Sequence, residues 1–324
     1  MSFRDIKGQD KPIHMLKGYI EQLHLEGGYL FVGPEGMGKK LVARTLAKVL
    51  NCLEEGTDSC DRCVSCMKIE DNRHPDVHII ENSEAEIKIE YIRQLQREIA
   101  LKPYEGKIKV FIIDNAHKLT AEAQAALLKI LEEPPRMSLI ILISDKPALL
   151  FKTIISRCKI LKFYSLARPE LENIFKKDYG LDNNMAHFLA YFSEGRLGRA
   201  LRLKDTDILS VKNSLIDKLA LSRKVNLENL SLQNRAEVRD CLNILATWFR
   251  DIYLIKIGMP YCEIINFDRK DELLKAMSRF SFLDLNEILD SISDSISYLE
   301  RNINIKLLLY NLSEDITYGV RRTT

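Results

Sequence analysis

The sequence predicts an α/β domain in its first half, followed by an all-α region. Five short apolar runs alternate with segments of helical periodicity up to residue 163. The first run leads into a glycine-rich turn and then into a basic helix start, an order found in α/β nucleotide-binding folds. After residue 163 no run is typical of a strand, and helical spacing continues along the chain. At 324 residues, two or three domains are expected.

The elements of the α/β part follow from the apolar runs and their boundaries. We expect strands at 29–32, 77–80, 109–113, 138–143 and 159–163. We expect helices at 12–25, 41–50, 87–100, 120–133 and 147–153. The fourth of these helices is alanine-rich and ends at Pro134-Pro135, because proline cannot continue a helix.

The remainder of the chain has amphipathic spacing only. A small helical unit is expected from 168–178, 183–192 and 196–204, and longer helices from 236–256, 282–301 and 304–318. Trp248 is expected to pack in the core of the last part. We place the domain boundaries near residues 165 and 207, which divides the chain into 1–165, 166–206 and 207–324.

Composition excludes several classes of protein. The 48 basic and 46 acidic residues leave a net charge of +2, which argues against a stand-alone nucleic-acid binder. The first residues have no apolar leader, and no stretch approaches 18 apolar residues. We therefore expect a soluble, cytoplasmic protein, whose seven cysteines are not a disulfide framework.

The glycine-rich turn fits a phosphate-binding loop except at its last position. Glycines let backbone N–H groups surround a polyphosphate, and a lysine reaches the terminal phosphates; the expected residues are Gly33, Gly36, Gly38 and Lys39. The hydroxyl that would hold Mg²⁺ is replaced by Lys40, which repels the ion. The alternative is a chance glycine-rich turn, but strand, glycines and lysine occur in the required order.

A second nucleotide-site signal follows the third expected strand. In ATPases with such a loop, an acidic residue at this strand end lies on the magnesium side, and here it is Asp114. The next residue would be a glutamate that polarises water, but Asn115 cannot act as a base. Asp114 alone could be a helix cap, so the nucleotide site depends on the loop upstream.

Four cysteines with short spacing predict a metal site. Cys52, Cys60, Cys63 and Cys66 suit tetrahedral coordination of Zn²⁺ by four thiolates. Unrelated buried cysteines or a redox CxxC pair are the alternatives. No histidine or carboxylate in the sequence is obviously placed to leave an open coordination position for catalysis. The zinc would therefore be structural and would hold an insertion in the α/β domain.

Several segments together resemble the bacterial clamp-loader subunits of the AAA+ superfamily. The resemblance is dense up to about residue 205 and then rests mainly on the last segment. The segments are 3–9, 29–39, the four cysteines, 110–117, 123–135, 156–158, 194–201 and 300–312.

The resemblance implies a RecA-like AAA+ domain with a zinc module, a small helical lid and an all-α collar. It also implies a ring with gamma/tau and delta subunits that places the sliding clamp on primed DNA, as part of the DNA polymerase III holoenzyme. Three departures matter: Lys40, Asn115 and Gly198, which stands where active relatives carry a phosphate-sensing arginine, although Arg196 and Arg199 flank it. We therefore expect ATP and Mg²⁺ binding to be weak or absent.

The Ser156-Arg157-Cys158 triplet, by contrast, is intact. The resemblance implies that Arg157 is an arginine finger, supplied in trans to a neighbouring gamma/tau ATPase site. The alternative is a local ion pair with Glu132 or Glu133. For the whole chain, the rival hypotheses are an active gamma/tau-type motor and a zinc-bearing DNA-binding protein.

Overall fold

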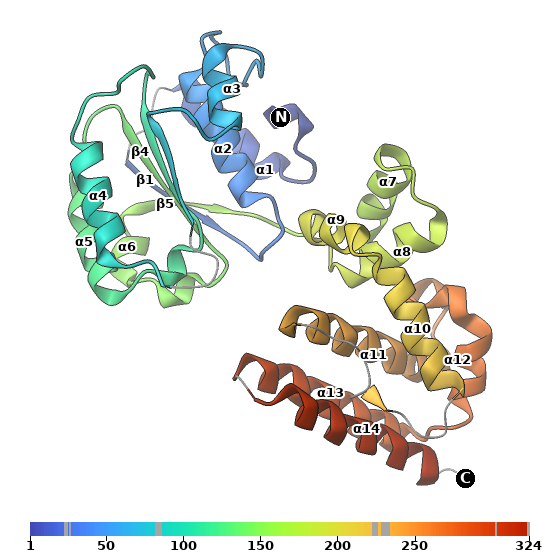
Figure 1. Cartoon of the computed structure of the whole chain (residues 1–324). Helices are drawn as coiled ribbons and strands as arrows, with labels where there is room; N and C mark the ends of the chain where they lie inside the picture. The colour runs from blue at the N-terminus through green and yellow to red at the C-terminus, as the bar shows by residue number, and fades with distance from the viewer. Residues whose placement is uncertain are drawn as a thin grey trace. The chain divides into compact units, whose positions relative to one another are not determined.

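The computed structural model describes residues 1–22, 25, 27–81, 86–221, 226–227, 234–301 and 303–322. The chain forms two compact units (Figure 1). The first comprises Met1–Leu166 with Arg196–Arg199, and the second comprises Ala167–Gly195 with Ala200–Thr324. The division into three domains that the sequence suggests stays a prediction.

A five-stranded parallel sheet forms the centre of the first unit. Its order is β2-β3-β4-β1-β5, and every pairing is parallel. The strands are β1 (Gly27–Val32), β2 (Val77–Ile80), β3 (Lys109–Ile113), β4 (Ser138–Ser144) and β5 (Cys158–Lys162). All residues of β3 and β4 are buried, as expected of strands covered on both faces. The predicted α/β fold with five strands is thus confirmed.

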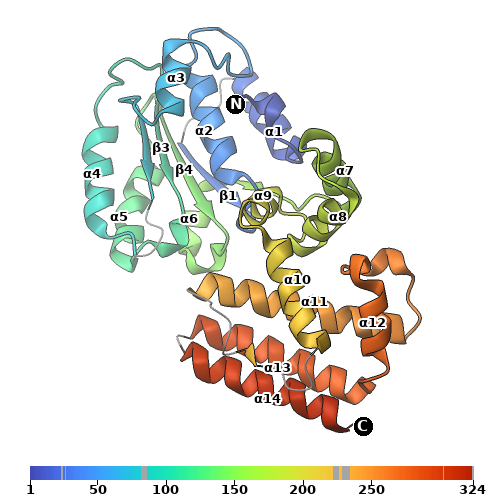
Figure 2. The same ribbon diagram turned by 45° about the vertical axis from the view of Figure 1, so that its right-hand side comes forward.

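Helices cover both faces of this sheet (Figure 2). On one face lie α1 (Asp10–Glu21), α2 (Lys39–Asn51) and α3 (Val64–Glu70), which share a core with Phe31, Ile112 and Ile141. On the other lie α4 (Ile89–Ile99), α5 (Ala121–Glu132) and α6 (Lys152–Ile155), which pack on Leu30, Ile113 and Leu142. Successive residues of a strand contribute alternately to the two cores, because successive side chains point to opposite faces of the sheet.

The prediction of a helix at 147–153 is wrong. A 3₁₀ turn covers Pro147–Leu149, Leu150 is extended, and α6 begins only at Lys152. The physical reason is tertiary: the Phe151 N–H donates to Oε1 of the buried Gln124 at 2.8 Å, so it does not bond within a helix.

Among the described residues of the second unit, every regular element is a helix and none is a strand, as expected. Trp248 is buried, as predicted. The helices after β5 are α7 (Arg168–Asp178), α8 (Asn183–Phe192), α9 (Leu197–Asp205), α10 (Ile208–Leu221), α11 (Arg235–Lys256), α12 (Lys270–Met277), α13 (Phe282–Glu300) and α14 (Ile305–Arg322). Further 3₁₀ turns are Phe3–Asp5, Ala116–Lys118, Tyr261–Glu263 and Phe267–Arg269.

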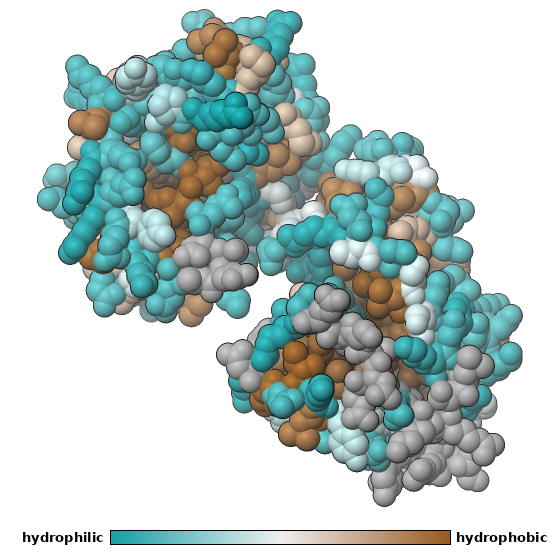
Figure 3. All heavy atoms as spheres, viewed as in Figure 1, coloured by the Kyte–Doolittle hydropathy of each residue, from teal (hydrophilic) through white to brown (hydrophobic). Residues whose placement is uncertain are grey.

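Polar side chains cover most of the face shown in Figure 3, with hydrophobic residues in smaller groups. In the part of the chain that the structure describes, no helix has the length and apolar character needed to span a membrane.

Candidate functional site

The glycine-rich loop connects the end of β1 to the start of α2, at the carboxyl edge of the sheet. Gly36 and Gly38 have φ angles of 82° and 81°, and Gly38 is the N-cap of α2. A Cβ on Gly36 would lie 2.9 Å from the Arg199 nitrogen. Both backbone conformation and space therefore require glycine at Gly36. The loop combines this backbone with a helix N-terminus, an arrangement that suits phosphate.

The lysine of the loop is folded onto the loop itself. Lys39 Nζ donates to the carbonyl oxygens of Gly33 at 2.5 Å and Pro34 at 2.7 Å. Burial lowers the pKa of Lys39, while the carboxylates of Asp145, Asp114 and Glu35 oppose that shift. The Lys39 ammonium, which would contact phosphate in an active site, is thus hydrogen-bonded to carbonyl oxygens of its own loop.

Lys40 lies where a magnesium site would need a hydroxyl. Its ammonium pairs with Glu81 and is 4.0 Å from Asp114 Oδ2. Asp114 thus lies at the end of β3 as the sequence predicts, but beside a cation. The residues present do not fit a Mg²⁺ ion, since the hydroxyl ligand is missing and an ammonium lies near the carboxylate. Glu81 was not identified from the sequence, because only the fold brings it to Lys40.

The residue after Asp114 has an unusual backbone. Asn115 has a φ of 53°, and its N–H donates to Asp114 Oδ1 at 2.9 Å. Nearby, His117 Nδ1 lies 3.0 Å from Asp145 Oδ1. Burial lowers the pKa of His117, and the charge of Asp145 opposes this. This pair was not predicted from the sequence, although the polar Ser144-Asp145 at the end of β4 was a signal for it.

The segment at Gly198 contacts the loop through its backbone. The Gly198 N–H donates to the Gly36 carbonyl oxygen at 2.9 Å. A Cβ on Gly198 would lie only 2.8 Å from that oxygen. A larger residue would have to displace one of the two segments, so an arginine does not fit here without rearrangement.

The four predicted cysteines come together in the structure. Their sulfur atoms all lie within 4.8 Å of one another. Cys52 caps the end of α2, Cys63 caps the start of α3, and Cys66 lies in α3. Backbone N–H groups donate to the sulfurs, from Cys63 to Cys60 and from Cys66 to Cys63, both at 3.4 Å. This all-thiol donor set fits a tetrahedral metal ion.

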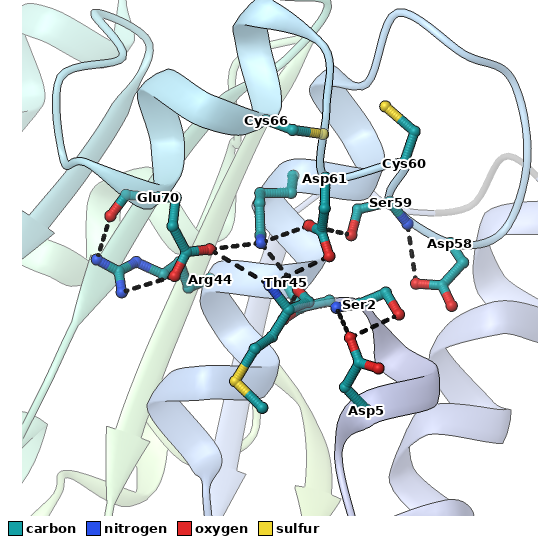
Figure 4. A network of polar contacts seen from close by, with 12 residues as sticks. Ser2, Asp5, Arg44, Thr45, Asp58, Ser59, Cys60, Asp61, Cys66 and Glu70 are labelled. Atoms are coloured by element: carbon teal, nitrogen blue, oxygen red, sulfur yellow. Dashed lines mark hydrogen bonds and ion pairs between the residues drawn. The ribbon is translucent and has the colours of Figure 1, made fainter.

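Lys48 of α2 is buried and connects this helix to the cysteine cluster through Asp61 and Glu70, both labelled in Figure 4. Lys48 Nζ donates to Asp61 Oδ1 at 2.7 Å and to Glu70 Oε2 at 2.6 Å. It also donates to the Met1 carbonyl oxygen at 2.8 Å. Asp61 belongs to the loop between Cys60 and Cys63, and Glu70 ends α3. The Lys48 ammonium therefore connects α2 with the loop between Cys60 and Cys63 and with α3.

Arg157 lies between α6 and β5 and has two local partners. Its Nη1 donates to the Thr153 carbonyl oxygen at 3.0 Å, and its Nη2 is 2.8 Å from Glu132 Oε1. Ser156 Oγ also donates to the Thr153 carbonyl oxygen, at 3.1 Å. Cys158 is the first residue of β5, and burial raises the pKa of its thiol to about 12, which disfavours the nucleophilic thiolate at neutral pH.

The register of the sheet separates Arg157 from this chain's own glycine-rich loop. Cys158 pairs with Gly28 near the start of β1, whereas Lys162 pairs with Val32, just before Gly33. Four residues of strand, or about 13 Å, lie between these levels. Arg157 is therefore at the amino edge of the sheet and the loop is at the carboxyl edge.

The chain matches two models of known families. "DNA polymerase III, delta subunit" matches residues 8–167, and "DNA polymerase III, delta subunit, C terminal" matches residues 209–313. Among curated relatives, DNA polymerase III subunit delta' of Bacillus subtilis is 29% identical over 319 residues, 94% of either chain.

Other relatives are longer than this chain. DNA polymerase III subunit tau of Escherichia coli is 36% identical over 218 residues, which are 64% of this chain and 33% of that protein. Among solved structures, a DNA polymerase III gamma subunit-related protein of Thermotoga maritima has a TM-score of 0.50 at 19% identity. The match covers 96% of this chain and 100% of the other, and it supports the fold.

Proposed function

Because the chain belongs to the delta-prime family of bacterial DNA polymerase III clamp-loader subunits, we propose that it is a ring member that does not hydrolyse ATP itself. In this proposal it joins gamma/tau and delta subunits, and the assembled ring places the sliding clamp on primed DNA. Residues 1–165 provide the AAA+ domain, and residues 166–206 and 207–324 serve as lid and collar.

The observation that carries the proposal is the position of Lys40. Mg²⁺ normally bridges the β- and γ-phosphates and neutralises developing charge. An ammonium paired with Glu81 and 4.0 Å from Asp114 opposes that ion. Asn115 supplies no base, and Lys39 is bonded to its own loop. Weak binding of phosphate by the backbone amides of the loop is compatible with these three features, whereas hydrolysis of ATP is not.

Arg157 supplies the catalytic contribution to a neighbour. Its place at the amino edge of the sheet supports action on another subunit's nucleotide. A guanidinium offers several donors to phosphate oxygens and is always charged. A finger of this kind contributes about 10³–10⁵ in rate, or roughly 4–7 kcal/mol of barrier.

A structural Zn²⁺ held by Cys52, Cys60, Cys63 and Cys66 is part of the proposal. When bound, the ion would cross-link the end of α2, the following loop and α3. Its contribution is to the stability of the first unit.

The test is reconstitution with gamma/tau and delta subunits of the same organism. The isolated chain should show no magnesium-dependent ATP turnover, and the complex should show clamp-stimulated ATPase. Arg157→Ala should leave folding and assembly intact and lower turnover at the one neighbouring site by about 10³-fold or more. Full clamp-stimulated activity in the Arg157→Ala complex would refute the finger.

The second candidate is an active gamma/tau-type motor. The observation that favours it is the 36% identity to Escherichia coli tau over 64% of this chain. Turnover by the pure chain that needs Mg²⁺ and disappears in Lys39→Ala would establish this candidate in place of the first.

A further inference from the structure

Helix α5 holds the chain segment that leads to Arg157. Gln124, which is buried near the start of α5, accepts a hydrogen bond from the Phe151 N–H at 2.8 Å. Its side-chain amide donates to the carbonyl oxygens of Leu119 at 3.2 Å and Leu149 at 3.3 Å. The loop before α6 is therefore fixed to α5 by a side chain that is itself fully bonded.

The last residue of α5 holds the guanidinium. Glu132 Oε1 is 2.8 Å from Arg157 Nη2, and the Thr153 carbonyl oxygen accepts from Nη1 at 3.0 Å. The chain turns away directly after α5, at Pro134-Pro135, so the carboxylate lies on a well-defined helix end. Both the loop and the side chain of Arg157 are thus attached to one helix.

These contacts leave most of the guanidinium available. An arginine has five N–H donors, and the two contacts use one on each terminal nitrogen. Within the described part of the chain, no partner is found for the other three donors. The side chain is also 35% exposed. Arg157 can therefore keep Glu132 and still donate to phosphate oxygens of a neighbouring subunit.

We propose that Glu132 is a positioning residue, which fixes the orientation of the Arg157 guanidinium before it engages the neighbour's nucleotide. This inference rests on the proposed function of Arg157 as a finger. The ion pair with Glu132 and the finger are then two parts of one mechanism. An exposed pair contributes little to folding, and Glu132 is 49% exposed, so loss of the pair should leave the stability of the first unit nearly unchanged.

The expected effect follows from side-chain order. A long side chain that is already immobilised loses less freedom when it engages phosphate. Glu132→Ala should lower kcat at the neighbouring site by about three- to tenfold. The KM for ATP should not change, because Glu132 does not touch nucleotide.

The experiment uses the reconstituted complex, with the other ATP sites inactivated by substitution of their loop lysines. Steady-state ATPase is measured against ATP concentration for Glu132→Ala, Glu132→Gln and the control Glu133→Ala. Glu133 is the adjacent exposed carboxylate, and among the described residues the ion pair of Arg157 is with Glu132 and not with Glu133. The glutamine variant keeps an acceptor oxygen and should recover part of the lost kcat, and the control should match the wild type.

Two further arms separate this inference from the function on which it rests. In an Arg157→Ala background, Glu132→Ala should cause no additional loss, because its effect passes through the guanidinium. An equal loss in both backgrounds, or no loss in either, overturns the role of Glu132. An Arg157→Ala complex with normal ATPase overturns the finger itself. Melting temperatures of the isolated variants should equal that of the wild type, which excludes a folding defect.

Discussion

Replacement of Lys48 by methionine should destabilise the first unit strongly. The ammonium is almost completely buried, and it donates to Asp61 at 2.7 Å and Glu70 at 2.6 Å. Methionine keeps the apolar stem but leaves two carboxylates and the Met1 carbonyl without this donor. Each charge-assisted hydrogen bond contributes about 1.5–3 kcal/mol. The carboxylates are partly exposed and regain water, so we expect a total loss of about 2–4 kcal/mol.

The assay is urea and thermal unfolding of the zinc-loaded chain, together with the rate at which a chelator removes the metal. At about 2–4 °C per kcal/mol, the melting temperature of the first unit should fall by roughly 5–15 °C. Metal release should become faster, because Asp61 lies between two of the cysteine ligands. The matched control is Lys68→Met, whose ammonium pairs with Glu105 at 2.7 Å at an exposed position. Surface pairs contribute about 0–1 kcal/mol. A Lys48→Met protein no less stable than the control would show that this reasoning is wrong.

Three further predictions follow from the same unit. The wild-type chain should hold one zinc ion, and Cys63→Ser should reduce this content and lower the melting temperature, as elemental analysis and calorimetry would show; an unchanged metal content would contradict the site. Lys40→Thr should make nucleotide affinity depend on Mg²⁺ in titration calorimetry without restoring turnover, and an unchanged magnesium dependence would exclude the proposed role of Lys40. The hydrogen bond from Lys48 lowers the pKa of Glu70. The ionised Glu70 therefore stabilises the fold above the ordinary carboxyl pKa, and this stabilisation is lost as pH falls through the lowered pKa. Unfolding free energy should therefore decrease below about pH 4.5, less steeply in Glu70→Gln, and identical slopes for the two proteins would rule this out.

Local patterns made much of the fold predictable. The central strands β3 and β4 are short, mainly apolar runs, because a strand covered on both faces needs apolar residues along its length. The glycine-rich turn was recognisable since its backbone demands glycine at Gly36. The cysteine cluster was also recognisable, because Cys60, Cys63 and Cys66 are close in sequence and can reach one ion.

The sequence by itself determined that the chain has a five-stranded α/β domain, a glycine-rich loop without its magnesium hydroxyl, a four-cysteine cluster and a helical remainder. Only the tertiary structure decided which distant groups meet. It paired Lys40 with Glu81, it chose Glu132 over Glu133 as the partner of Arg157, and it used Gln124 to interrupt the helix expected at 147–153. The physical reason is that periodicity and spacing report contacts between residues close in sequence. A hydrogen bond across 27 residues, or an ion pair across 41, depends on the spatial order of the parallel strands in the sheet.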